Sequence, residues 1–217
     1  CGCGNFLIIA YRELRRLEVA VLIQMRKLRG RFAETWQTDI SLLSLIDVDA
    51  FYGIELEEFP VRIAEVALWL TDHQMNMELS AEFGQTYTRL PLKKSAHIVQ
   101  GNALLVDWAA FVPKPAAAEK EATLFILGNP PFVGKQNRTA QQTTDMQALG
   151  ANLTGIGVLD YVCAWYMKAA EYIQGTKIKV AFVSTNSITQ GEQVGVLWPW
   201  LLGKGVKIHF AHRTFKW

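Results

Sequence analysis

Short apolar runs that alternate with stretches of helical periodicity constrain the fold of this chain most. The clearest runs are residues 123–128 and 178–184, which are mostly apolar. Runs of this length, flanked by polar or glycine-containing segments, are typical of buried strands. Because strands alternate with helices along the whole chain, we expect an α/β fold with a doubly wound, mostly parallel sheet.

Further elements fit the same alternation. Helices are expected over residues 7–30, 60–77, 162–173 and 191–202, and strands over residues 51–55, 97–102 and 206–211. Pro60 suits the start of its helix, whereas Pro199 is expected to end or kink the last one. Residues 114–121 resemble a surface linker. Residues 133–157 show little periodicity, so we expect a long functional or mobile loop there.

The first helix carries apolar side chains at helical spacing. They are Leu7, Tyr11, Leu14, Val21, Met25 and Leu28. Arg12, Arg15 and Arg16 lie between them and are expected to form a solvated face rather than a DNA-binding patch. A less regular apolar stretch follows at residues 40–46.

Composition limits the classes of protein to which the chain can belong. Its 217 residues suffice for one α/β domain with a sizeable core. A net charge of +2 is too small to mark the whole surface as a nucleic-acid binder. No apolar run is long enough to span a membrane. Three cysteines without zinc-site spacing indicate no metal site and a reducing, cytoplasmic environment.

The tetrad Asn129-Pro130-Pro131-Phe132 directly follows the strand expected at residues 123–128. Ligands bind at the carboxyl ends of strands in α/β sheets. The Asn129 side-chain oxygen and the Pro130 carbonyl can both accept hydrogen bonds from an exocyclic amino group. The prolines restrict the backbone, and Phe132 offers a stacking face. The alternative is an ordinary proline-rich turn.

Glycines alternate at the start of the chain, where Gly2 and Gly4 precede the first helix. Such a loop lets a ligand approach the backbone closely. Glu55 ends the strand expected at residues 51–55, where a carboxylate can accept from ribose hydroxyls. It lies 51 residues beyond Gly4 (55 − 4), which is too far for the nicotinamide fingerprint and counts against a dehydrogenase.

Together, the two motifs resemble the N6-adenine DNA methyltransferases, which use S-adenosylmethionine. Residues 1–7 match the end of their Asp-Pro-Ala-Cys-Gly-x-Gly-x-Phe-Leu cofactor loop, and residues 129–132 match their Asn-Pro-Pro-Tyr/Phe catalytic tetrad. The order of the motifs resembles the gamma-type arrangement, which includes the methylase domains of Type IIG restriction–modification enzymes. The resemblance implies a Rossmann-like class I catalytic domain over residues 1–217, without its first strand and without a target-recognition domain.

The resemblance also implies a cofactor site. Its expected residues are Gly2, Gly4, Phe6, Glu55, Asn102 and Asn129. Phe6 would pack on the methionine part of the cofactor, Glu55 would bind the ribose, and Asn102 would bind the exocyclic amine. Core packing, a helix-start acid and a turn residue are the respective alternatives. Asp160 matches a family position near the cofactor, and it could equally cap a helix.

The implied substrate is duplex DNA with a flipped adenine. Phe132 and Phe215 would pack against the base, although core packing is open for Phe215. Lys135 and Arg138 would contact phosphates, or else lie solvated.

The expected function is methyl transfer to N6 of adenine in a restriction–modification or phage-defence system. A recognition domain of a parent chain is an expected partner, and whether a nuclease domain of that chain is a second one is left open. A class I methyltransferase acting on protein glutamine or RNA, and a fold kept only for binding, are the alternatives.

Overall fold

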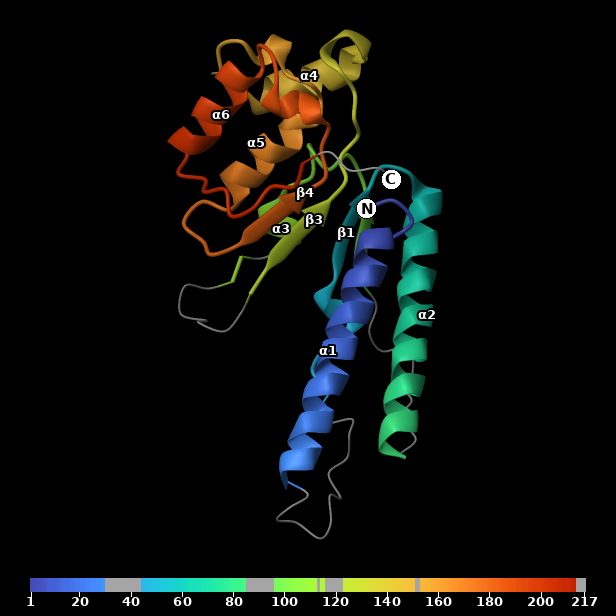
Figure 1. Ribbon diagram of the computed structural model, residues 1–217. Helices are drawn as coiled ribbons and strands as arrows, with labels where there is room; N and C mark the ends of the chain where they lie inside the picture. The colour runs from blue at the N-terminus through green and yellow to red at the C-terminus, as the bar shows by residue number, and fades with distance from the viewer. Residues whose placement is uncertain (30–43, 85–95, 113, 116–122, 151–152, 214–217) are drawn as a thin grey trace. The chain divides into compact units, whose positions relative to one another are not determined.

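The computed structural model describes residues 1–29, 44–84, 96–112, 114–115, 123–150 and 153–213. The chain divides into two compact units, Cys1–Ala103 and Leu104–Trp217, and each is described by itself (Figure 1). Each unit combines helices with a parallel pair of strands, so the expected α/β class and parallel pairing are confirmed. In the described residues the strands form two separate pairs, and a single doubly wound sheet stays a prediction.

Unit 1 is built from two long helices and two short strands. Its elements are α1 (Asn5–Arg29), η2 (Val48–Ala50), β1 (Tyr52–Glu55), α2 (Glu58–Phe83) and β2 (His97–Gln100). The strands pair in parallel, with Glu55 beside Gln100 at their carboxyl ends. Helix α2 extends six residues beyond the expected Met77 (83 − 77) and ends at Gly84, whose φ of 65° is left-handed. Both helices are drawn side by side in Figure 1, and their side chains pack against each other.

The buried face of α1 differs from the expected one. Tyr11 and Leu22 are buried, whereas Leu14, Val21 and Leu28 are exposed. Arg15 lies on the buried face at 0% exposure, so its assignment to a solvated face was wrong. Its position four residues after Tyr11 and seven before Leu22 places all three on one side of the helix.

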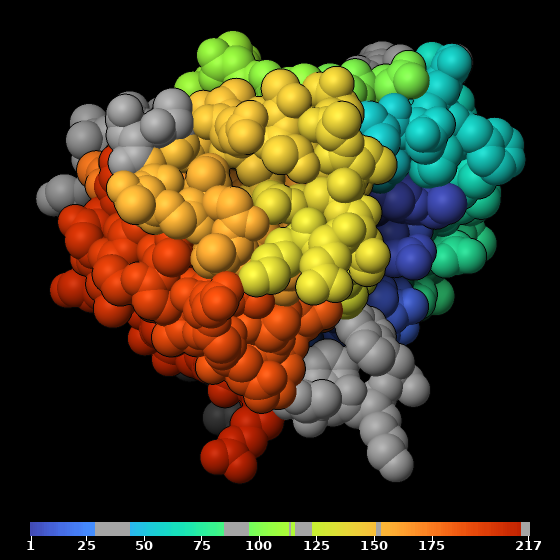
Figure 2. All heavy atoms as spheres, turned by 90° about the horizontal axis from the view of Figure 1, so that it is seen from above, coloured from blue at the N-terminus to red at the C-terminus, as the bar shows by residue number. Residues whose placement is uncertain are grey.

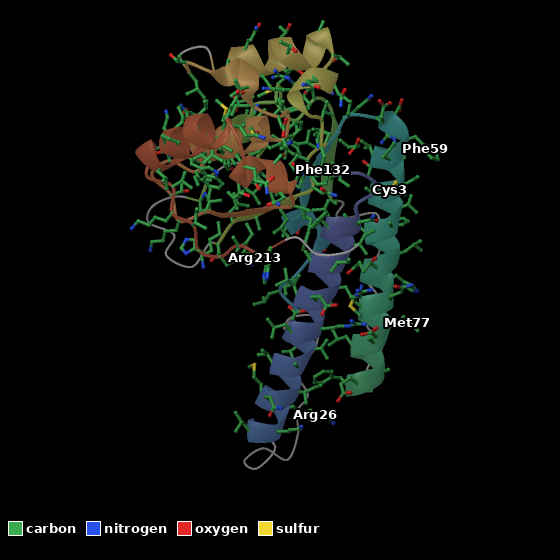
Figure 3. All side chains as sticks on the ribbon, turned by 45° about the horizontal axis from the view of Figure 1, so that its top comes forward. Cys3, Arg26, Phe59, Met77, Phe132 and Arg213 are labelled. Carbon is green, nitrogen blue, oxygen red and sulfur yellow. The ribbon has the colours of Figure 1, made fainter. Side chains whose placement is uncertain are left out.

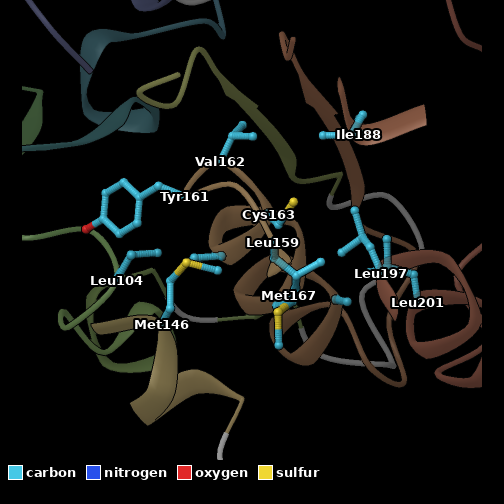
Figure 4. Packing of buried hydrophobic residues seen from close by; sticks show 12 residues of the cluster. Leu104, Met146, Leu159, Tyr161, Val162, Cys163, Met167, Ile188, Leu197 and Leu201 are labelled. Atoms are coloured by element: carbon cyan, nitrogen blue, oxygen red, sulfur yellow. The ribbon is translucent and has the colours of Figure 1, made fainter. Parts of the chain in front are cut away.

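Unit 2 contains two strands and several short helices around one core. Its elements are α3 (Trp108–Phe111), β3 (Phe125–Gly128), η3 (Lys135–Asn137), α4 (Ala140–Leu149), η4 (Ile156–Val158), α5 (Cys163–Tyr172), β4 (Lys179–Phe182), η5 (Asn186–Thr189) and α6 (Val194–Gly203). Strand β3 pairs in parallel with β4. Figure 4 shows the core, in which Leu159, Cys163 and Met167 pack with Leu197 from α6.

The expectation of a long loop over residues 133–157 was wrong. Helix α4 forms there, and Figure 2 shows this yellow part of the chain packed against the orange and red parts of unit 2. A reciprocal capping box between Thr139 and Gln142 starts the helix. Met146, at 1% exposure, anchors it in the core. Few other side chains of α4 are buried, so its periodicity is weak.

One expectation near the end of the chain was wrong, and another, that Pro199 ends or kinks the last helix, was wrong as to the end of the helix. Residues 206–211 pair with no strand in the described part of the chain, and Ile208 and Phe210 are exposed there. Pro199 does not end α6, which continues to Gly203. Most of the apolar stretch 40–46 and of the linker 114–121 lies outside the described residues. Among the described residues, no helix is long and apolar enough to cross a membrane.

Candidate functional site

The tetrad lies directly beyond the carboxyl end of β3. Gly128 is the last residue of β3 and faces Phe182 of β4. A Cβ at Gly128 would lie 3.2 Å from the Phe182 ring, so glycine permits this close approach. The Val183 N–H donates to the Gly128 carbonyl over 3.0 Å, which extends the strand pairing to the residue before Asn129. The strand pairing therefore fixes the position of the backbone at Gly128, the residue before the tetrad.

The side chains of the tetrad divide between interior and surface. Pro130 is buried, while Asn129 and Phe132 are exposed, Phe132 by 43%. Phe132 is labelled in Figure 3. No hydrogen bond engages the Asn129 side chain within the described residues. An amide oxygen and an aromatic ring are thus free to meet a ligand.

The two cations expected to contact phosphate lie just beyond the tetrad and differ in their surroundings. The Lys135 ammonium pairs with Glu192 over 3.0 Å, and both side chains are exposed. The Arg138 guanidinium donates to the Gly157 carbonyl over 2.9 Å and contacts the Met146 sulfur at 2.7 Å. Arg138 therefore joins the end of η3 to α4 and η4 within unit 2. Lys135 is the better placed of the two for an outside partner.

Asp160 lies before α5 but does not cap it. The N-cap of α5 is Val162, without a side-chain cap. The Asp160 carboxylate instead accepts from the Lys135 N–H over 3.0 Å, from Ser187 Oγ over 2.7 Å and from Gln193 Nε2 over 3.0 Å. Sequence reasoning missed Ser187 and Gln193, because neither carries a motif or a periodic signal.

The glycine loop of unit 1 has the backbone freedom that was expected of it. Gly2 and Gly4 have φ of 60° and 85°, in the left-handed region that favours glycine. A Cβ at Gly4 would lie 3.0 Å from Ala64 Cβ, so the loop closely approaches α2. A Cβ at Gly2 would meet nothing within 4 Å, so space beside this backbone is open.

The Glu55 side chain, at the end of β1, contacts both the glycine loop and the start of α2. Its Oε2 accepts from the Gly2 N–H over 2.5 Å and from the Cys1 amino group over 3.0 Å. Its Oε1 accepts from the N–H groups of Leu56 and Glu57, over 2.9 and 3.3 Å, at the start of α2. The contacts with Leu56 and Glu57 fit the helix-start alternative, and the contact with Gly2 places the carboxylate at the glycine loop, while ribose binding stays a prediction.

Burial and hydrogen bonds act oppositely on the pKa of Glu55. Burial raises this pKa, while hydrogen bonds from the amino terminus and from the Gly2 N–H outweigh burial and lower it. The carboxylate therefore stays charged at neutral pH.

Asn102 and Phe6, two further expected cofactor residues, belong to the same unit, whereas Asn129 belongs to unit 2. The Gly101 N–H donates to the Glu55 carbonyl over 2.7 Å, which brings the turn at Asn102 next to the end of β1. Asn102 is partly buried, and Phe6 is partly exposed in the first turn of α1. Phe215 lies outside the described residues.

Each unit thus assembles its own group of candidate residues. Unit 1 brings together Gly2, Gly4, Glu55 and the turn at Asn102, and unit 2 brings together the tetrad, Lys135 and Asp160. In the part of the chain that the structure describes, no group of three or more histidine, cysteine or acidic side chains could hold a metal ion.

Comparison with known proteins gives consistent matches over the whole chain. The family model described as "MmeI, DNA-methyltransferase domain" matches residues 1–217. DNA methyltransferase A of Bacillus subtilis (strain 168) is 38% identical over 218 residues, which cover 100% of this chain and 23% of that protein. A solved structure of the Type IIL restriction–modification enzyme MmeI in complex with DNA is 55% identical, with a TM-score of 0.86.

That structural match covers 100% of this chain and 28% of the other, so the chain spans about a quarter of the length of these relatives. The matches confirm the resemblance to methylase domains of restriction–modification enzymes that the two motifs carry.

Proposed function

The chain belongs to the MmeI DNA-methyltransferase domain family, and from this premise we propose that it transfers a methyl group from S-adenosylmethionine to N6 of adenine in DNA. The observation that carries the proposal is the tetrad at the carboxyl end of β3, where Asn129 and Phe132 are exposed. We further propose that residues 1–217 form the catalytic domain of a larger restriction–modification enzyme, whose other domains recognise and cut DNA.

The chemistry needs positioning more than a strong base. The lone pair of adenine N6 is delocalised into the ring, so the nitrogen is a weak nucleophile. Asn129 Oδ1 and the Pro130 carbonyl would each accept a hydrogen bond from N6 and favour a nitrogen whose lone pair points out of the ring plane. After N6 has gained the methyl group, it would lose one of its protons to solvent water. The prolines keep both acceptors in place, and Phe132 would stack on the flipped base. Placement and electrostatics carry such a step.

The residues of unit 1 fit the proposed cofactor. S-adenosylmethionine, when bound, supplies an electrophilic methyl group on a positively charged sulfur. The open space beside Gly2 suits a ligand against the backbone. Glu55, which contacts the glycine loop at the Gly2 N–H, would accept from a ribose hydroxyl, and Asn102 would accept from the adenine amine of the cofactor. Phe6 would cover the methionine part.

Substitution of Asn129 in the parent protein tests this proposal. Asn129→Ala removes one of two acceptors and should lower methyl transfer to DNA by about 10²–10³-fold, the range for losing one such group. Binding of S-adenosylmethionine should change much less than the rate of transfer, because the other expected cofactor residues are untouched. Asn137→Ala, in the nearby exposed η3, is the matched control and should methylate like the wild type.

Identification of the product tests the substrate. Mass spectrometry of nucleosides from methylated duplex DNA should find N6-methyladenine. Wild-type rates in Asn129→Ala would contradict the tetrad assignment. A methylated cytosine, or transfer only to RNA or protein, would contradict the adenine assignment.

A further inference from the structure

Two adjacent residues, Asp160 and Tyr161, hold the segment that follows the tetrad. The Tyr161 N–H donates to the Val133 carbonyl over 2.8 Å, and the Lys135 N–H donates to Asp160 Oδ1 over 3.0 Å. The Val133 N–H in turn donates to the Pro131 carbonyl over 3.2 Å. A continuous series of hydrogen bonds therefore runs from the residues before α5 into the tetrad.

The second oxygen of Asp160 is held from the other side. Ser187 in η5 and Gln193, the residue before α6, both donate to Oδ2, over 2.7 and 3.0 Å. Gln193 is buried, and its own Oε1 accepts from the Asp160 N–H over 3.2 Å. The Asp160 side chain thus joins three segments of unit 2 and has little freedom to move.

The charge of Asp160 suits this role. Burial raises the pKa of this carboxyl group, but the hydrogen bonds from Ser187, Gln193 and the Lys135 N–H outweigh burial and lower the pKa. The group is therefore a carboxylate at neutral pH. Hydrogen bonds to a charged acceptor are about twice as strong as neutral ones.

The tetrad lies between two fixed points. On one side the Gly128 carbonyl accepts from the Val183 N–H of the strand pair. On the other side Asp160 and Tyr161 hold residues 133–135. Two of the four residues between these points are prolines, which restricts the tetrad further.

We propose that Asp160 is a positioning residue for the tetrad. Through the Lys135 N–H it keeps Asn129 and the Pro130 carbonyl where both can accept from one amino group, without itself contacting the base. This inference rests on the proposed function of the tetrad. A misplacement of about 1 Å can cost about 10²-fold in rate, so a residue that only positions the acceptors can matter strongly.

Asp160→Asn in the parent protein tests the proposal. An amide has one accepting oxygen, so the variant cannot satisfy all three donors that the carboxylate accepts. We expect kcat to fall by about 10–100-fold while the KM for S-adenosylmethionine changes by less than about threefold. Hydrogen exchange at the Lys135 amide should become faster.

Asp107→Asn is the matched control. Asp107 is a carboxylate of the same unit that accepts from two backbone N–H groups, those of Ala109 and Ala110, over 2.8 and 3.2 Å at the start of α3. Its substitution should leave kcat and the exchange of the Lys135 amide unchanged. Equal losses of kcat in the two variants would show that Asp160 has only a structural role and would overturn the proposal. A kcat for Asp160→Asn within about twofold of wild type would overturn it as well.

Two further variants distinguish failure of the positioning proposal from failure of the proposed function or of folding. Asn129→Ala in the same assay separates the two hypotheses: if it stays active, the proposed function of the tetrad fails, and if only Asp160→Asn stays active, positioning alone fails. Ser187→Ala serves where Asp160→Asn does not fold, because it keeps the carboxylate and removes one bond. We expect it to lower kcat by about tenfold, the lower end of the range for losing one hydrogen bond to a charged group, and an unchanged kcat would refute positioning by Asp160.

Discussion

Glu55 gives the sharpest test of the cofactor site, because its carboxylate binds the glycine loop and the start of α2 at once. Three backbone N–H groups, those of Gly2, Leu56 and Glu57, donate to its two oxygens. Glu55→Gln keeps the shape of the side chain but replaces one oxygen by an amino group. Whichever way the amide turns, at least one of the three N–H groups then faces a donor instead of an acceptor.

The magnitude follows from what the cofactor would lose. A hydrogen bond to a charged group contributes about 1.5–3 kcal/mol, so losing one ribose contact should weaken binding of S-adenosylmethionine by about 10–150-fold. Isothermal titration calorimetry of the parent protein measures this directly. Glu57→Gln is the matched control, since it removes the same charge from the same helix start without touching Gly2. It should bind the cofactor like the wild type.

The acid dependence of stability provides a second readout of the same residue. Because folding lowers the pKa of Glu55 from its ordinary value of 4.5, the stabilisation is present above that pH and is lost as the pH falls further. The melting temperature of Glu55→Gln should therefore fall less steeply on acidification than that of the wild type. A dissociation constant for Glu55→Gln within about twofold of wild type would show that Glu55 only starts a helix.

Two further predictions concern the base and the core. Phe132→Ala should weaken stacking by about 1–3 kcal/mol and brighten 2-aminopurine placed at the target adenine, whereas Phe132→Tyr should keep it quenched; equal brightness in both complexes would contradict stacking. Arg15→Met should lower the free energy of unfolding by about 3–5 kcal/mol, because it leaves the Glu18 carboxylate buried without its partner. Chemical denaturation followed by circular dichroism measures this loss, and addition of Glu18→Gln should recover part of it.

The elements with strong periodicity could be predicted from the sequence. The stretches that became α1, α2 and α5 are long enough for apolar side chains to repeat several times. The strands at residues 97–100 and 125–128 were visible as short apolar runs between polar segments. Element ends were less certain, because a helix ends where local capping allows it, as at Gly84.

The segments that were predicted wrongly lack either a strong sequence periodicity or a strand to pair with. Helix α4 buries little besides Asp145 and Met146, so the only sequence signal was the capping box at Thr139 and Gln142. Residues 206–211 alternate like a strand, yet a strand also needs a neighbour to pair with, and none pairs with it among the described residues. Alternation alone records a local tendency and carries no information about pairing.

The motifs of the candidate site could be predicted from the sequence, but the contacts that hold these motifs in place could not. Asn129 and Phe132 follow an apolar run, and Gly2 and Gly4 alternate, so each was visible locally. The contacts of Asp160 with Ser187 and Gln193 join residues 27 and 33 positions apart. A single sequence holds no record of such distant pairs, because the fold alone brings them together.

Arg15 shows how the fold of unit 1 serves the glycine loop. It donates to Asn76 over 2.8 Å, as Tyr11 donates to Asp72 over 2.5 Å, and both bonds join residues 61 positions apart. A constant offset means that α1 and α2 run parallel, with their registers fixed by buried polar contacts. Helix α1 begins directly after Gly4, and α2 begins three residues after Glu55 (58 − 55). A shift of one helix along the other would therefore move Gly4 away from Ala64 and break the contact between Glu55 and the loop, so the buried contacts of Tyr11 and Arg15 help to keep the glycine loop in place.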